Sequence, residues 1–192
     1  MSADVSGQPP PADPAVRRAA TADASPATDW GPLVITLAVQ LAVSFAATAP
    51  LAISVAIADA LRIDHALIGL YSALLYGAAI GGTLAGPWAM RRVASVRLMV
   101  LCLVVNAAGL AVFAQIGAAL PWGIAGNIIM GLAYGLVAPV TAVTLNDGFS
   151  ARAQPLIVSI KQTGVPLGTA LSAAVLPAVA LGHGWRWALG LA

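Results

Sequence analysis

From Leu33 onward the chain alternates long apolar runs with short polar breaks, and this pattern constrains its fold more than any other feature. A helix needs about 20 predominantly apolar residues to cross the hydrocarbon core of a bilayer. Five runs reach that length, and a sixth begins near Trp185. We therefore predict an all-α, polytopic membrane protein, a bundle of five full transmembrane helices and a partial sixth. The expected spans are residues 33–58, 66–90, 98–117, 122–145 and 156–181, with the partial span at 185–192.

The composition excludes the main soluble classes. Charged residues make up 8% of the chain and hydrophobic residues 60%, whereas about a quarter of a typical soluble domain is charged. The net charge of +2 provides no basic patch, so we exclude a nucleic-acid partner. No catalytic triad, zinc-protease motif or phosphate loop occurs, and we expect neither an enzyme nor a cofactor or metal. The single cysteine, Cys102, is expected to be a small buried hydrophobe.

The first 30 residues differ from the rest of the chain. They are rich in Pro, Ala, Ser and Asp and contain no apolar run, so we expect a disordered tail. The tail also lacks the apolar core of a cleavable signal peptide, and the first span should therefore be retained. The short polar breaks make consecutive spans antiparallel neighbours.

The arginines predict the orientation in the membrane. Cytoplasmic loops carry an excess of Lys and Arg. If the tail is cytoplasmic, the opposite side carries only Arg62 and Arg186. We therefore expect a cytoplasmic N-terminus in the cell's inner membrane, with the other six loop and tail arginines on the same side: Arg17, Arg18, Arg91, Arg92, Arg97 and Arg152.

Polar side chains in a span are costly in lipid, so their positions indicate faces turned toward protein or a cavity. Helical spacing aligns such residues on the first, second, fourth and fifth spans. On the third span Asn106 and Gln115 fall on opposite sides, which predicts a peripheral helix. Interhelical hydrogen bonding and the lining of a cavity both explain the stripes. The candidate binding residues are Gln40, Ser44, Thr48, Tyr76, Asn127, Tyr134, Lys161 and Gln162.

The same spans contain several glycines and prolines. Glycines four residues apart let helices approach closely, and this role is expected for the pairs Gly77/Gly81, Gly82/Gly86, Gly131/Gly135 and Gly164/Gly168. Proline interrupts the helical hydrogen-bond ladder, so kinks are expected near Pro50, Pro87, Pro139, Pro166 and Pro177.

Lys161 is the one cation inside the five full expected spans. It can extend to the headgroups or pair with Asp147 near the same interface. It can also face a water-filled cavity and attract an anion, which its neighbours Gln162 and Thr163 favour.

Two stretches, residues 86–97 and the part of the fourth span from Asn127 to Gly135, resemble motifs of the major facilitator superfamily. The loop after the second span, residues 86–97, is similar to the family's G-x-L-A-D-R-x-G-x-x-R signature: Gly86, Ala89 and Arg91 match, while Met90 replaces the acid and Val93 the second glycine. The fourth span resembles the family's R-x-x-x-G-x-x-x-G stretch, with Asn127 in place of its arginine. The resemblance covers roughly residues 31–192 and implies an inner-gate role for Gly86, Arg91, Arg92 and Arg97.

The resemblance implies the N-terminal half of a two-bundle transporter, ending within its sixth helix. We expect part of a secondary active transporter that moves a small solute by alternating access, and Lys161 favours an anion. Its partners would be the lipid bilayer, the substrate, and a second six-helix half or another copy of the chain. The alternatives are a non-transporting fragment or partner-dependent half-transporter subunit, and a small homo-oligomeric channel.

Overall fold

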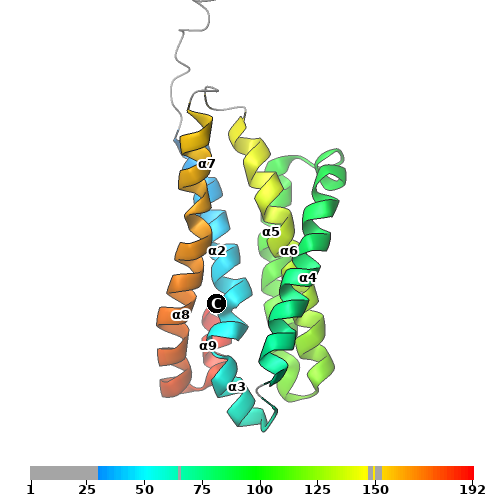
Figure 1. The fold of residues 1–192 in the computed structure, drawn as a ribbon, viewed down its shortest axis with the longest axis vertical. Helices are drawn as coiled ribbons and strands as arrows, with labels where there is room; N and C mark the ends of the chain where they lie inside the picture. The colour runs from blue at the N-terminus through cyan, green and yellow to red at the C-terminus, as the bar shows by residue number, and fades with distance from the viewer. Residues whose placement is uncertain (1–29, 65, 147–148, 150–152) are drawn as a thin grey trace, which may run out of the picture.

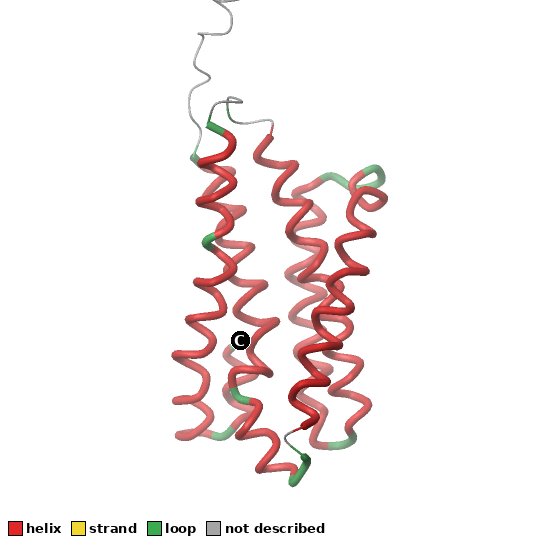
Figure 2. Tube along the Cα trace, in the orientation of Figure 1, coloured by secondary structure: helices red, strands yellow, loops and turns green. Residues whose placement is uncertain are grey.

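The computed structural model describes residues 30–64, 66–146, 149 and 153–192, and all of its regular elements in these ranges are helices. The expected disordered tail, His65 and Asp147 lie outside the described residues. Figures 1 and 2 show long helices running up and down one axis, joined by short loops. The elements are α2 (Gly31–Ala52), α3 (Ser54–Leu61), α4 (Ala66–Met90), α5 (Ser95–Phe113), a 3-10 helix η1 (Ala114–Gly117), α6 (Leu120–Asn146), α7 (Gln154–Gln162), α8 (Gly164–His183) and α9 (Trp185–Leu191).

The helices have the length and composition of membrane spans. Within the described residues, four segments are long and apolar enough to cross a bilayer: Gly31–Ala52, Ser95–Gly117, Leu120–Leu145 and Gln154–His183. The α4 helix has 25 residues, which extend roughly 37 Å at about 1.5 Å per residue. The predicted all-α membrane bundle is confirmed.

Two groups of helices make up the bundle (Figure 1). In one group α2 packs against α8 and α7, and in the other α6 packs between α4 and α5. Contacts of α2 with α6 and α5 join the groups. The α2 and α6 helices are therefore central to the bundle.

Two spans that the sequence presents as continuous are each interrupted once. The first is split at Ile53, three residues after Pro50, where ψ is 18°. The fifth is split at Thr163, three residues before Pro166, and the Thr163 amide bonds the Ile160 carbonyl only three residues back (3.1 Å). The break at Thr163 follows from the missing N–H of Pro166, which would have bonded the Gln162 carbonyl. Pro50 lacks the bond to the Ala46 carbonyl, seven residues before Ile53, so its missing N–H does not explain the first break. In contrast, α4, α6 and α8 continue through Pro87, Pro139 and Pro177.

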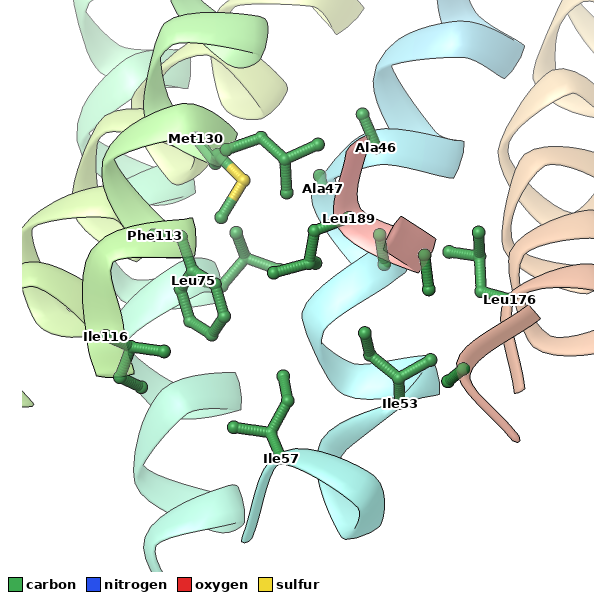
Figure 3. Packing of buried hydrophobic residues seen from close by; sticks show 14 residues of the cluster. Ala46, Ala47, Ile53, Ile57, Leu75, Phe113, Ile116, Met130, Leu176 and Leu189 are labelled. Carbon is green, nitrogen blue, oxygen red and sulfur yellow. The ribbon is translucent and has the colours of Figure 1, made fainter. Parts of the chain in front are cut away.

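A buried apolar cluster joins the two groups at one end of the bundle. Phe113 and Met130 lie on one side of it and Leu176 on the other. Figure 3 shows Leu189 of α9 extending toward Phe113 and Met130. The short α9 helix therefore fills the core between groups, and burying a side chain of this size excludes lipid from the gap.

Glycines allow α4 and α6 to approach backbone to backbone. A Cβ atom on Gly135 would collide with the Ala79 carbonyl, and one on Gly82 with the Leu132 carbonyl. The Thr83 hydroxyl uses the close approach to donate to the Gly135 carbonyl (3.0 Å). The expected packing role is wrong for Gly77, which is exposed and would have nothing within 4 Å of an added Cβ.

Gly135→Ala and Gly77→Ala form a matched pair of substitutions. We expect Gly135→Ala to destabilise the protein by about 1–3 kcal/mol, because α4 and α6 must separate. Gly77→Ala should be neutral or stabilise by up to about 1 kcal/mol, since alanine favours the helix. Unfolding in mild detergent, followed by circular dichroism, measures both. Equal stability of the two variants would contradict the close-packing interpretation.

Candidate functional site

Three candidate residues follow one face of α2 at four-residue spacing. Gln40, Ser44 and Thr48 are all buried. The Thr48 hydroxyl donates to the Ser44 carbonyl of its own helix (2.7 Å), so it is already satisfied. Gln40 Oε1 has no hydrogen-bond partner among the described residues, and Ser44 Oγ makes no bond of good geometry, although it lies beside Tyr134. The face therefore presents two polar groups that the fold leaves unsatisfied.

The α8 helix covers this face through its glycines. An added Cβ on Gly164 would lie 3.1 Å from the Cβ of Gln40, and one on Gly168 would lie 2.9 Å from the Cβ of Ser44. One turn further along α8, Ser172 is fully buried, and its hydroxyl finds no partner in the described part of the chain. Close packing by glycine thus brings the polar groups of α2 and α8 into one interface.

Lys161 lies one turn before Gly164, at the end of α7. Its side chain is 3% exposed, and Nζ donates to the Ala138 carbonyl of α6 (3.3 Å). The ammonium therefore points into the bundle and does not extend to the surface. Asp147, the alternative partner, lies outside the described residues, while neighbouring Gln162 is exposed.

The α6 helix contributes Asn127 and Tyr134. The Tyr134 ring packs edge-on against that of Tyr76 on α4, with centroids 6.3 Å apart, and Tyr76 is half exposed. Asn127 is buried, and its Nδ2 has no partner among the described residues. It faces a small cavity beside Pro50 and Ser72 with room for about one or two waters. Tyr76, like Gln162, is thus a candidate that is open to the outside of the bundle.

Asn106 is an interior polar residue on the third span, where helical spacing predicts no polar stripe. It is buried, and its Nδ2 donates to the Val43 carbonyl of α2 (3.2 Å). The interpretation of the third span as peripheral is therefore wrong at this position. The missed signal was the asparagine itself, because a lone amide in a span is costly unless it faces protein.

The loop with the family-like signature lies at the end of the bundle between α4 and α5. A Cβ on Gly86 would lie 2.8 Å from the Pro139 ring, so Gly86 packs α4 onto α6. Arg91, Arg92 and Arg97 are exposed, and the Arg92 guanidinium stacks 4.4 Å from the centre of the Trp88 ring. An inner-gate role for these residues stays a prediction.

The interior polar groups share one chemical property. Buried polar atoms are nearly always hydrogen-bonded, and an unsatisfied one costs about 1–3 kcal/mol. Here they combine donors and acceptors with one cation, and no cluster of potential metal ligands occurs among the described residues. The arrangement suits water or a small polar solute. Among the described residues, the buried side-chain atoms without a hydrogen bond of good geometry are Gln40 Oε1, Ser44 Oγ, Asn106 Oδ1, Asn127 Nδ2 and Ser172 Oγ.

Comparison with known proteins identifies the class of molecule. No curated protein and no solved structure matches the chain. A family model, the Major Facilitator Superfamily, matches residues 34–192, which is most of the chain. Members of this family are transporters, not enzymes, and act on small-molecule substrates in a lipid bilayer. The chain forms an apolar helical bundle and matches this family over most of its length. It is therefore a multi-pass membrane protein that belongs to the major facilitator superfamily.

Proposed function

We propose that this chain forms part of a secondary active transporter that moves a small anionic solute by alternating access. The observation that carries the proposal is the buried Lys161 ammonium, whose bond to the Ala138 carbonyl balances no charge. A lysine at the centre of a span costs about 2.5–3.5 kcal/mol, and Lys161, the eighth residue of the segment Gln154–His183, lies nearer one end, where the cost is smaller. An anion that reaches Nζ would neutralise this charge and strengthen its hydrogen bonding.

The neighbouring unsatisfied groups would select the solute. Gln40 lies where α8 closes on α2, one turn beyond Lys161, and it offers an acceptor. Asn127 offers a donor nearer the other end of α6. A solute that moves between such groups exchanges one set of hydrogen bonds for another, which suits a site that must also release its ligand.

The transporter would be completed by a second six-helix half or by another copy of the chain. Major facilitator transporters bind substrate between two bundles near the bilayer midplane. The half-exposed Tyr76 and the exposed Ile80 and Leu84 on α4 provide a surface for that second bundle. The partner would also cover polar groups that lipid cannot satisfy.

A thermal-shift experiment on the purified chain tests the role of Lys161. The ligands are phosphate, acetate, succinate and citrate, with glycerol and glucose as neutral controls. We expect an anion to stabilise the wild type, by about 2.7 kcal/mol at a hundred times its Kd. Lys161→Gln should abolish this gain, Lys161→Arg should keep part of it, and Arg186→Gln should leave it intact.

Two results would count against this assignment. A neutral solute that stabilises the wild type and Lys161→Gln equally would show that charge is not selected. An anion that stabilises Lys161→Gln as much as the wild type would place its site elsewhere.

Ser172→Ala and Thr83→Val compare an unpartnered hydroxyl with a bonded one. The Ser172 hydroxyl contributes nothing to folding if it is kept for a solute, so Ser172→Ala should leave stability unchanged or raise it by up to about 1 kcal/mol. The Thr83 hydroxyl bonds across helices, and Thr83→Val should cost about 0.6–1 kcal/mol. Chemical unfolding in detergent measures both. A loss in Ser172→Ala equal to that in Thr83→Val would assign Ser172 to the fold.

The proposed location is the inner membrane, with the N-terminus and the α4–α5 loop in the cytoplasm. Ala94 and Ala119 lie at opposite ends of the α5 region, and both are exposed. In a Cys102→Ala background, Ala119→Cys should react with a membrane-impermeant maleimide on intact cells. Ala94→Cys should react only after permeabilisation, because the three arginines of its loop favour the cytoplasmic side of the membrane. The reverse pattern would invert the topology.

A further inference from the structure

A groove runs between α4 and α5 on the side of the bundle away from Lys161. Both helices pack along α6, but they scarcely touch each other. The space between them has a volume of about 230 Å³, and α6 forms its floor. The lining consists of apolar residues only, with Gly82 and Ala85 from α4, Leu101 and Val105 from α5, and Ala133 and Leu136 from α6 among them.

The small side chains give the groove its depth. Gly82 and Ala133 are buried, while Ala85 and Leu101 are exposed along its edges. An open apolar groove on a membrane-spanning surface faces hydrocarbon, so the molecules that reach it are lipid chains. Among its lining side chains only the Cys102 thiol, a weak donor, could hydrogen-bond a polar solute, which separates the groove chemically from the Lys161 site.

The end of the groove is strongly basic. The loop that joins α4 to α5 carries Arg91, Arg92 and Arg97, and residues 86–97 contain no acid. Arg97 lies one turn from Leu101, about 6 Å along the α5 axis, and Arg91 directly follows the end of α4, six residues after Ala85. All three arginines are exposed. Positive charge therefore lies at headgroup level, directly beyond a groove that fits an acyl chain.

We propose that this groove and loop form a binding site for one anionic phospholipid. An acyl chain occupies the groove between α4 and α5, and the headgroup phosphate accepts hydrogen bonds from Arg91 and Arg97. Exposed Trp88, which stacks with Arg92, lies at the interface where tryptophan is favoured. Because the loop has no carboxylate to balance its arginines, it favours an anionic headgroup over a zwitterionic one.

Native mass spectrometry of the full chain tests the site. Phosphatidylglycerol and phosphatidylcholine with identical acyl chains are the probes, titrated into the delipidated protein. An arginine near an anionic lipid contributes about fivefold in affinity, so Arg91→Gln/Arg97→Gln should weaken phosphatidylglycerol binding roughly 25-fold. The matched double variant Arg62→Gln/Arg186→Gln, at the other end of the bundle, should bind as the wild type does.

A groove-filling variant separates the acyl-chain site from simple charge attraction. Ala85→Trp should lose both lipids, whereas Leu181→Trp on the exposed face of α8 should lose neither. Ala85→Leu serves as a smaller filler if the tryptophan variant does not fold, which circular dichroism reports. Equal affinity of the wild type for the two lipids would overturn the proposal. So would unchanged binding in Arg91→Gln/Arg97→Gln or in both Ala85 variants.

Discussion

In a bilayer an apolar side chain gains little by leaving lipid for protein, so this bundle depends on how closely its backbones can approach. Gly135 against Ala79 and Gly82 against Leu132 bring α4 and α6 together, and Gly164 and Gly168 do the same for α8 on α2. Each approach increases dispersion contacts along the whole pair of helices. These few positions account for the pairing of α4 with α6 and of α8 with α2, whereas the junction between the groups is the apolar cluster that contains Phe113, Met130 and Leu189.

The same close approach creates the candidate site. Because Gly168 carries no side chain, α8 comes near enough to bury Ser44, and Gly164 does the same for Gln40. Lys161 lies at the end of α7, one turn before Gly164, and its ammonium donates to the Ala138 carbonyl of α6. Packing that stabilises the bundle also confines the polar groups that a solute would use, so the binding proposal and the fold share the same residues.

Much of this architecture could be predicted from the sequence, because hydrocarbon permits few alternatives to helices of a set length. The buried stripe at Gln40, Ser44 and Thr48 followed from spacing alone. Asn106 did not, since a single amide makes no stripe and its direction depends on how α5 rotates against α2. Gly77 likewise shows that a glycine pair fits close packing only where a neighbouring helix is present. The exposure of Gln162 beside the buried Lys161 also needed the three-dimensional structure.

The interruption at Thr163 has a mechanical consequence for the fifth span. Pro166 cannot donate the hydrogen bond that the Gln162 carbonyl would accept, so bending at this point stretches fewer bonds than bending within α8. The α8 segment is held on α2 by its glycines, whereas α7 lies on the other side of the weak point and carries the charge. The fifth span therefore consists of a long segment held on α2 and a shorter segment, α7, whose Ile157 packs against Leu33 and Leu145. The position of the Lys161 ammonium relative to Gln40 is thus set by the packing of α7 and not by a continuous helix through Thr163.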